Sequence, residues 1–580
     1  MFKKVLKDFQ PALFTSLKDY NKEKMTADLM AGTIVAFVAA LPLAIAFAIS
    51  SGVTPEKGII TAIIAGFITS LLGGSNVQIG GPAGAFIIIV YGIVEQYGIN
   101  GLAIVTVLAG IMLLLMGVLK LGSVIKFIPY PIVVGYTSGI ALTIFSTQIK
   151  DLFGMQIGQV PLDFFAKWQM YFESISAINW IAAGVGLASI LIIVVTPRFS
   201  KRLPGSLLAI VLLTIVVYVM RYQFGIEGIE TIGDRFEFSS QLPKAESISF
   251  SLESIRILFP SAFTIAMLAA IETLLSATIA DGMIGTRHNS NMELIAQGVA
   301  NIVVPFFGGI PATGAIARTA TNVNSGARTP VAGIWHTVVL LLILLFLGGL
   351  TKHIPMAALA GVLVVVSYNM SEMRSFRMLA KQSRGTLAIL LATFFLTVVV
   401  DITVAIEVGL LLAVFTFINR VSKTTHVTHT KGSVDISKEI ESHSGNLKDE
   451  ILELPDNVEV YEIDGPFFFG VANKFDDLMR ELGTKSEIRI IRMRKVPFMD
   501  ATGLNNLNGL IRNSQKENIH IILSGVTESV REKLHKSTII ELVGEENVCD
   551  NIHLAVGRAI EVSATLEKQK ETSSKKSNKK

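Results

Sequence analysis

The fold is indicated most directly by the stretch Phe307-Gly308-Gly309-Ile310-Pro311-Ala312-Thr313-Gly314-Ala315-Ile316-Ala317-Arg318-Thr319, which lies between long apolar runs. Non-helical backbone is tolerated at membrane depth only where it is buried in protein or lines a cavity. A similar stretch, Gly80-Gly81-Pro82-Ala83-Gly84-Ala85, occurs earlier in the chain, and we call these two similar sequences the Gly/Pro echoes. Broken segments at corresponding positions in two halves point to the substrate site of a transporter. We therefore predict that the two stretches form one binding site.

The composition indicates an integral membrane protein followed by a soluble part. The 580 residues are 51% hydrophobic, and the mean hydropathy is +0.57. The single cysteine, Cys549, excludes an intramolecular disulfide. The first 24 residues lack the continuous apolar core of a cleavable signal peptide. We expect five parts: a cytoplasmic N-terminal segment (1–25), a transmembrane transport domain (26–422), a linker (423–454), an α/β domain (455–563) and a disordered basic tail (564–580).

Hydrophobic periodicity predicts fourteen α-helical transmembrane segments. They are placed at 27–50, 58–73, 83–95, 101–119, 129–149, 179–196, 206–221, 259–280, 293–306, 312–323, 331–350, 355–370, 386–400 and 402–420. Two of them, 83–95 and 312–323, are too short to span in the usual way, and both follow a Gly/Pro echo. Basic residues gather in the loops that are inside when the lysine-rich N-terminus is cytoplasmic. Both termini are therefore predicted to be cytoplasmic, at the cell (inner) membrane.

A second pair of similar sequences supports an internal repeat of the transmembrane domain. The sequences 121–135 and 347–361 share six of fifteen positions at a constant offset of 226. Seven spans per half give the halves opposite topology, so we predict a 7+7 inverted repeat. In the soluble part, 458–463, 488–493 and 519–524 have strand patterns, whereas 475–482, 502–516 and 527–535 have helical spacing. This alternation predicts a small α/β sandwich.

The predicted site is an anion site. In an inverted repeat the two short helices start near the midplane with their N-termini facing, and each terminus offers free N–H groups and about half a positive charge. Small residues at Ala83, Gly84, Gly314, Ala315 and Ala317 would let an anion approach the backbone, and Arg318 adds a full charge. The alternatives are close helix packing for the glycines and an internal ion pair for Arg318.

A mid-span carboxylate, Glu272, is predicted to couple transport. An acid at this depth is a functional-site hypothesis by default. It could carry a proton, or ligate a cation together with Ser276 one turn later on the same face. The alternative is a fixed structural bridge between Glu272 and Arg318. We find no metal-ligand cluster, nucleotide-binding loop or catalytic triad spacing, so no enzyme, cofactor or resident metal is predicted beyond a coupling H⁺ or Na⁺.

Several stretches together resemble the SulP family of anion transporters, the sulfate permease family that includes pendrin and prestin. The stretches are 40–55 in the first span, 80–85, 271–277, 308–318 and, in the soluble part, Phe498-Met-Asp-Ala-Thr-Gly503, which is similar to the core motif of a STAS domain. The resemblance implies a uracil-permease-type fold in which the transport domain (26–422) is divided into a core and a gate, a homodimer and elevator-like alternating access.

The resemblance also implies residue roles. The anion would lie between the third and tenth helices, at Gly81, Pro82, Ala83 and Gly84 on one side and at Gly314, Ala315, Ile316, Ala317 and Arg318 on the other, with the first-helix aromatic Phe47 nearby. Glu272 and Ser276 match the positions implied for coupling. The STAS motif is Asp500, Ala501, Thr502 and Gly503; alanine replaces the serine that is phosphorylated in some STAS proteins, although Thr502 remains. Ala317 replaces a serine of the animal members.

These observations predict a secondary active transporter of a small anion, a sulfate-type inorganic anion in the first place, coupled to H⁺ or Na⁺. The alternatives are a bicarbonate or C4-dicarboxylate symporter or exchanger, an uncoupled anion channel, and a signalling protein whose STAS domain reads a membrane sensor. The expected partners are the anion, the lipid bilayer, a second copy of the chain and a cytoplasmic protein at the STAS domain, but no nucleic acid.

Overall fold

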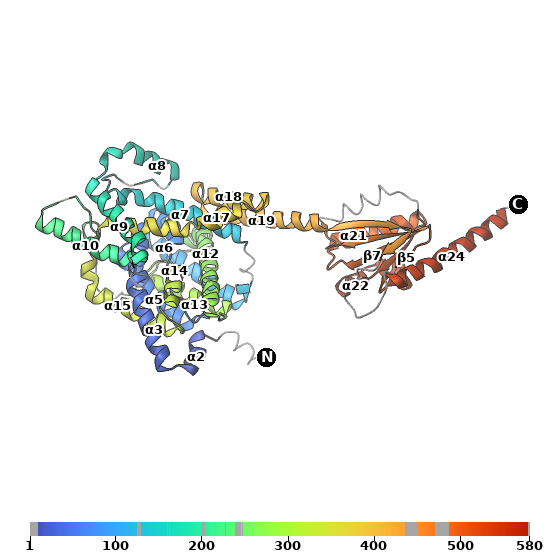
Figure 1. Ribbon diagram of the computed structural model, residues 1–580, viewed down its shortest axis with the longest axis horizontal. Coiled ribbons are helices and arrows are strands. Elements are labelled where there is room, and N and C mark those ends of the chain that lie inside the picture. Colours follow the sequence, from blue (N-terminus) through green and yellow to red (C-terminus); the bar gives the residue numbers. More distant parts are fainter. Residues whose placement is uncertain are drawn as a thin grey trace. The chain divides into compact units, whose positions relative to one another are not determined.

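The computed structural model of the protein (Figure 1) describes residues 10–123, 129–158, 160–161, 163–199, 204–226, 228–237, 245, 247–435, 451–469 and 486–577. The chain divides into two compact units, Met1–Ala413 and Val414–Lys580. The predicted helix 475–482 lies outside the described residues.

The first unit is helical, and each of the fourteen predicted segments has a helical counterpart. The elements in order are α2 (Ala12–Ser16), η1 (Leu17–Asp19), α3 (Lys22–Val35), η2 (Ala36–Ala40), α4 (Leu41–Ser50), α5 (Pro55–Leu72), β1 (Gly80–Pro82), η3 (Gly84–Phe86), α6 (Ile87–Val118), η4 (Leu121–Ser123), α7 (Tyr130–Leu152), α8 (Phe164–Glu173), η6 (Ile175–Ala177), α9 (Trp180–Phe199), α10 (Gly205–Gln223), α11 (Ile232–Arg235), α12 (Leu252–Ile284), α13 (Ser290–Val303), η7 (Val304–Phe307), β2 (Ala312–Gly314), α14 (Ile316–Asn324), α15 (Val331–Thr351), α16 (Met356–Met370), α17 (Met373–Ala380), α18 (Arg384–Val399) and α19 (Ile402–Thr424).

Ten helices in the described part of the chain are long and apolar enough to cross a membrane. One of these, Gly84–Val118, holds the two predicted segments 83–95 and 101–119, and its path is broken at Gly98, whose φ is 67°. The helices α13, α14 and α18 are shorter, with 14, 9 and 16 residues. The count of fourteen spans therefore stays a prediction. The unpacked faces of α9, α10 and α19 expose apolar side chains such as Leu191, Ile215 and Phe415, as expected for helices in contact with lipid.

The helices of this unit pack in two groups. In one group α6 packs against α12 and α13, and α15 packs against α3 and α5. In the other group α7 packs against α16 and α18, and α9 packs against α10 and α16. Small residues allow close crossings, since a Cβ added at Gly298 of α13 would lie 2.5 Å from the backbone nitrogen of Leu114 in α6. The first group holds both Gly/Pro echoes.

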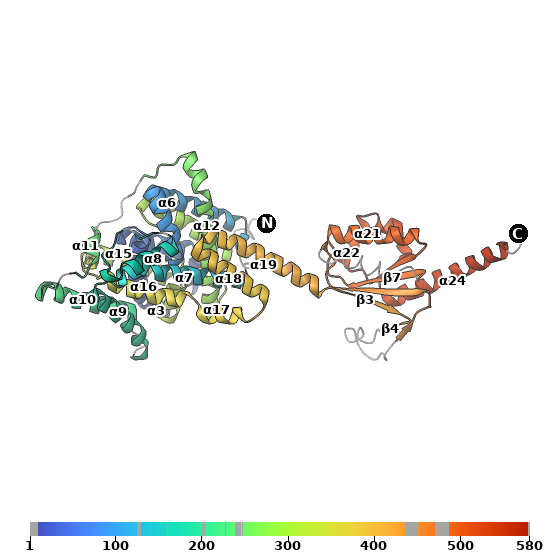
Figure 2. The same cartoon turned by 90° about the horizontal axis from the view of Figure 1, so that it is seen from above.

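The second unit contains an α/β sheet. Its elements are β3 (His426–Lys431), β4 (Ser433–Asp435), β5 (Ile451–Glu453), β6 (Val458–Asp464), β7 (Ile488–Lys495), α21 (Ala501–Lys516), β8 (His520–Ser524), α22 (Glu528–His535), α23 (Ile539–Val543), η9 (Glu545–Asn547), β9 (Val548–Cys549) and α24 (Ile552–Ser577). The main sheet has the order β3-β6-β7-β8-β9, with β3 antiparallel and the other pairs parallel. Apolar side chains of α21, α22 and α23 pack on one face and those of α24 on the other (Figure 2). The predicted strands 458–463, 488–493 and 519–524 and the helices 502–516 and 527–535 are confirmed.

Two predicted boundaries differ from the structure. The segment predicted as a linker, 423–454, contributes β3 to the edge of the sheet, where its exposed polar alternation gives no core signal. The tail predicted to be disordered from residue 564 continues α24 to Ser577. Val562 and Leu566 extend the apolar stripe of α24 onto the sheet, and Lys570 forms an ion pair with Glu487. These contacts hold a segment whose Lys, Ser and Glu composition alone predicted disorder.

Candidate functional site

The two Gly/Pro echoes meet as a pair of antiparallel strands. Gly80 lies opposite Gly314, and Pro82 lies opposite Ala312. The nitrogen of Ala315 extends the pairing by donating a 3.0 Å hydrogen bond to the carbonyl oxygen of Ile79. Each strand leads directly into a helix, β1 into η3 and α6 and β2 into α14. Because the strands are antiparallel, the two helices start at opposite ends of the pair, which is the relationship that the repeat predicted.

Side chains from α12 and α13 satisfy the backbone of β2. The hydroxyl of Thr273 accepts a 3.0 Å hydrogen bond from the nitrogen of Gly314, and it lies 2.8 Å from the hydroxyl of Thr313. The amide of Asn301 makes two hydrogen bonds of 2.9 Å with the backbone of Ala312. Water is scarce at membrane depth, so non-helical backbone needs such partners.

Gln78, just before β1, joins that segment to α12 and passes close to Gly314 of β2. Its amide nitrogen donates to the carbonyl oxygen of Thr273 at 3.1 Å, and a Cβ added at Gly314 would lie 1.5 Å from this nitrogen. Sequence reasoning missed Gln78, Thr273 and Asn301. A signal was present for one of them, since Glu293, Gln297 and Asn301 recur at four-residue spacing in an otherwise apolar segment.

The guanidinium of Arg318 is fully buried beside β1. Its Nη2 donates a 2.9 Å hydrogen bond to the carbonyl oxygen of Pro82, while Nε and Nη1 have no hydrogen-bond partner within the described residues. A Cβ added at Gly81 would lie 2.0 Å from Nη1, so glycine makes room for the arginine. The alternative of a Glu272–Arg318 bridge is not realised, because no ion pair joins these two described residues.

The predicted contact residues lie around the starts of the two helices. Ala83 and Gly84 are buried, and a Cβ added at Gly84 would meet the ring of Phe47 at 3.4 Å. On the other side Ile316 and Ala317 are exposed, although Arg318 directly after them is buried. Ile316 and Ala317 at the start of α14 are therefore accessible. The start of α6 is covered by Met370, whose sulfur would lie 3.0 Å from a Cβ at Gly84, and by the ring of Phe47.

Glu272 and Ser276 lie on α12, which packs against α14. Glu272 is half-buried and has no hydrogen bond or ion pair with any described residue. The Ser276 hydroxyl donates at 3.2 Å to the hydroxyl of Thr319, which in turn accepts from the nitrogen of Ile79 at 3.1 Å. Ser276 is thus tied to the strand pair through Thr319, whereas Glu272 has no such partner among the described residues.

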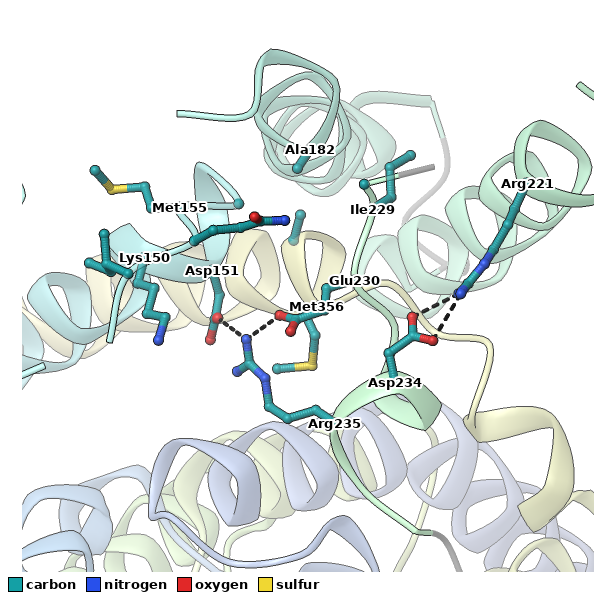
Figure 3. Close-up of a pocket in the computed structure, with 15 residues that line it drawn as sticks. Lys150, Asp151, Met155, Ala182, Arg221, Ile229, Glu230, Asp234, Arg235 and Met356 are labelled. Atoms are coloured by element: carbon teal, nitrogen blue, oxygen red, sulfur yellow. Dashed lines mark hydrogen bonds and ion pairs between the residues drawn. The ribbon is translucent and has the colours of Figure 1, made fainter. Parts of the chain in front are cut away.

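A separate polar cavity of about 450 Å³ lies where α7, α10 and α11 end (Figure 3). Arg221 makes two hydrogen bonds with the carboxylate of Asp234, of 2.7 and 2.9 Å, and these bonds lower the pKa of Asp234 to about 2. Arg235 lies between Asp151, at 2.8 Å, and Glu230. Although burial opposes it, the charges of Asp151 and Glu230 raise the pKa of Arg235. The arginines of this cavity are therefore paired with carboxylates.

In the second unit, Asp500 caps the start of α21. Its carboxylate accepts hydrogen bonds from the nitrogen of Gly503 at 2.7 Å and from that of Phe469 at 3.2 Å. Ala501 and Thr502 are exposed on the first turn, whereas Gly503 is buried against the backbone of Phe467. The motif is thus an N-cap that presents residues 501 and 502 at the surface.

Comparisons with known proteins agree with this architecture. Residues 25–393 match the sulfate permease family, and residues 451–556 match the STAS domain. A putative sulfate transporter of Bacillus subtilis, YvdB, is 38% identical over 536 residues, which are 92% of this chain and 98% of that protein. The bicarbonate transporter BicA of Picosynechococcus sp. is 28% identical over 523 residues, covering 88% of this chain and 91% of the relative.

Solved structures share the fold. The murine Solute Carrier 26 family member A9 anion transporter, solved in the inward-facing state, has a TM-score of 0.84 at 17% identity, covering 96% of this chain and 95% of that one. The transmembrane domain of a cyanobacterial BicA has a TM-score of 0.60 at 29% identity and covers 67% of this chain and 98% of its own. The chain therefore belongs to the sulfate permease family and is a multi-pass anion transporter with a C-terminal STAS domain.

Proposed function

We propose that the protein is a secondary active transporter of a small inorganic oxyanion, sulfate in the first place, coupled to H⁺ or Na⁺ through Glu272. The observation that carries the proposal is the buried Arg318 guanidinium, whose Nε and Nη1 have no hydrogen-bond partner within the described residues. A buried charge without a partner is costly unless a ligand compensates it. The Pro82 carbonyl offers a dipole but no countercharge, so a bound anion fits this position.

The charge at the site suits a divalent anion. Arg318 contributes one positive charge, and the starts of α6 and α14 contribute about half a charge each, about two in total. The backbone N–H groups at Gly84 and Ile316 would supply hydrogen bonds, as helix N-termini do for sulfate and phosphate elsewhere. Bicarbonate is the second candidate, because a bicarbonate transporter is among the relatives. A C4-dicarboxylate is the third.

Coupling is assigned to Glu272 because it is the half-buried carboxylate beside α14 that no described residue pairs. A cation or proton on this carboxylate would lower the cost of burying it and would favour an anion on the neighbouring helix start. An uncoupled channel has no need of this acid. The two packing groups of helices support elevator-like alternating access, in which the group holding β1 and β2 moves against the other. We place both termini in the cytoplasm and expect a homodimer with a protein partner at the STAS domain.

The proposal is tested by uptake into proteoliposomes of radiolabelled sulfate, bicarbonate and succinate, each with an imposed proton or sodium gradient. We expect sulfate to accumulate above its own equilibrium distribution with one of the two gradients. Flux that only follows the anion's own gradient under every condition would favour a channel or an exchanger and would remove the coupling role. Accumulation of bicarbonate or succinate instead of sulfate would keep the mechanism and change the substrate.

A further inference from the structure

A second cavity, of about 240 Å³, lies next to the cavity of Figure 3. It is bounded by the ends of α4 and α7, the start of α6, α8 and α11, and it shares Lys150, Asp151 and Arg235 with the first cavity. A water molecule needs roughly 10–15 Å³ on the same measure. The cavity therefore has room for an oxyanion together with several waters.

The cavity begins one helical turn from the central site on two helices. Ser50 lines it and follows Phe47 by three residues on α4, and Ile87 lines it and follows Gly84 by three residues. Three residues are close to one turn, so an ion in the cavity lies about 5 Å along each helix from the predicted anion position. The two positions are neighbours but use different side chains.

Lys167 of α8 is the buried charge that this cavity contains. Its side chain is 4% exposed, and its ammonium has no hydrogen bond or ion pair with any described residue. The helix that carries it is fixed, since the indole nitrogen of Trp168 donates to the Ser146 hydroxyl at 3.1 Å and Asp163 caps the helix start. Burial lowers the pKa of the Lys167 ammonium. A neighbouring anion would stabilise its charged form.

The charges around the cavity favour an anion. Three cations, Lys150, Lys167 and Arg235, line it against one carboxylate, Asp151. Asp151 already pairs with Arg235 at 2.8 Å, and Arg235 also pairs with Glu230. The ammonium of Lys150 donates once, to the carbonyl oxygen of Gly158 at 3.1 Å, and an ammonium has three donors. Within the described residues neither lysine forms an ion pair with a carboxylate, although the negative charge of Asp163 acts on Lys167.

Neutral polar side chains complete the lining of the cavity. The hydroxyls of Thr143 and Thr147 and the amide of Gln148 face the same cavity. The Gln148 amide nitrogen donates to the hydroxyls of Ser50, at 3.2 Å, and of Thr147, at 2.9 Å. The hydroxyls of Thr143 and Thr147 already donate to backbone carbonyl oxygens. An oxyanion bound here would therefore accept hydrogen bonds from the two lysines and from the Ser50 hydroxyl, and the lysines would balance its charge.

We propose that this cavity is a second anion subsite, in which Lys167 and Lys150 hold a small inorganic oxyanion before it passes to the central site. The proposal rests on the function proposed above for its choice of sulfate, but the residues that carry it are separate from Arg318 and Glu272. The cavity lies between the helix starts and the neighbouring cavity with its paired arginines. An anion that enters from that face of the transporter would bind here before it reaches the central site, so we call the subsite an entry station. A station of this kind raises the local anion concentration at the central site.

The subsite is tested by equilibrium binding of radiolabelled sulfate to the purified full-length protein in lipid nanodiscs. We expect two sulfates per wild-type chain at saturation. Lys167→Gln is expected to weaken one of them at least 10-fold, and Lys167→Arg is expected to restore it. Lys352→Gln, an exposed lysine whose backbone contacts Gly233 near the same cavities, is the matched control and should bind as the wild type. Thermal unfolding verifies that each variant is folded.

The outcomes separate the two proposals. If Lys167→Gln binds as many sulfates per chain as the wild type, with the same affinities, the proposal of a second subsite is wrong. Loss of one sulfate in Lys167→Gln, with none lost in Arg318→Ala, would support the subsite and remove the central site as proposed. Loss of one sulfate in Arg318→Ala, with none lost in Lys167→Gln, would support the central site and contradict the subsite. In proteoliposomes, Lys167→Gln is further expected to raise the KM for sulfate about 10-fold from one face alone, and an equal effect from both faces would also contradict an entry station.

Discussion

Arg318 and Pro82 join the two echoing segments, because Nη2 of the arginine donates a 2.9 Å hydrogen bond to the carbonyl oxygen of the proline. The arginine follows the first turn of α14, and the proline ends β1 just before α6 begins. The contact holds a full positive charge at the start of the opposite half-helix. Since the acceptor is a neutral carbonyl, the charge of the guanidinium is positioned but not cancelled.

Removing this guanidinium is expected to weaken anion binding. Arg318→Ala removes a charge-assisted donor, a contact of about 1.5–3 kcal/mol, so the Kd for sulfate should rise at least 10-fold. Arg384→Ala, which removes an exposed arginine at the start of α18, is the control and should leave the Kd unchanged. Binding of radiolabelled sulfate to folded protein measures both. An unchanged Kd in Arg318→Ala would show that the arginine is structural.

The space for the guanidinium depends on Gly81. A Cβ at this position would lie 2.0 Å from Nη1, so Gly81→Ala must displace either the arginine or the strand. Overpacking of this kind costs about 1–3 kcal/mol, and we expect a lower unfolding temperature together with weaker sulfate binding. Gly92→Ala on α6 is the matched control, because no atom lies within 4 Å of its added Cβ. Equal unfolding temperatures and affinities in the two variants would contradict the crowding argument.

Sequence patterns predicted the parts of the fold that depend on local chemistry. Apolar period and length located the helices, and the repeated Gly and Pro residues indicated that 80–85 and 308–315 correspond. Gly80 and Gly314 lie opposite each other in the strand pair. A Cβ at Gly80 would collide with Thr69, and one at Gly314 would collide with Gln78. The prediction of facing helix starts therefore followed from the residues themselves.

The remaining features depend on contacts between distant segments, which no local pattern encodes. The clamp formed by Thr273 and Asn301 satisfies β2 from two other helices. Threonine and asparagine in an apolar helix are as compatible with a bond to the preceding turn as with a distant partner. The sequence likewise predicts a linker where β3 lies, because an exposed edge strand lacks the alternating apolar residues that identify a strand.

The ion pair between Arg221 and Asp234 predicts a pH dependence of stability. The pKa of Asp234 is lowered to about 2, whereas an unfolded aspartate titrates near 3.9. A lowered carboxyl pKa adds stability that is complete above the unfolded value and is lost as pH falls toward the folded value. We expect Asp234→Asn to unfold about 1–3 °C below the wild type at pH 7, and the difference should shrink as pH falls from about 4 toward 2.

The control for this pair is Glu237→Gln, an exposed acid two residues beyond α11. Its unfolding temperature should follow that of the wild type at each pH. Thermal unfolding in nanodiscs between pH 7 and pH 3 measures all three proteins. A difference between Asp234→Asn and the wild type that does not change with pH would mean that the ion pair is not the cause.

The N-cap of α21 predicts a local change in the STAS domain. Asp500→Ala removes the acceptor for the nitrogens of Gly503 and Phe469, and loss of such a cap costs about 0.5–2 kcal/mol. Hydrogen exchange of the full-length protein should show faster exchange in the first turn of α21 than in the wild type. Asp456→Ala, an exposed acid before β6, is the control and should exchange as the wild type. Unchanged exchange at α21 in Asp500→Ala would show that the cap contributes little.

The coupling role of Glu272 gives the prediction that decides the mechanism. The carboxylate is half-buried on α12 beside the helix that carries Arg318, and no described residue pairs with it. Glutamine keeps the size and polarity of the side chain and removes its ability to take up a proton or neutralise a cation. Glu272→Gln is therefore expected to abolish concentrative uptake while it retains sulfate binding and exchange. Glu253→Gln, at the exposed start of the same helix, is the matched control.

The two possible coupling ions make different predictions for the wild type in the same assay. If Glu272 carries a proton, accumulation follows an imposed pH gradient and does not respond to sodium. If it ligates sodium, Ser276 would have to turn from Thr319, its partner at 3.2 Å, toward the carboxylate, so Ser276→Ala should raise the sodium concentration needed for half-maximal uptake. Unaltered accumulation in Glu272→Gln under both gradients would place the coupling step at another residue, because glutamine cannot take up a proton and its neutral amide oxygen binds sodium more weakly than a carboxylate does.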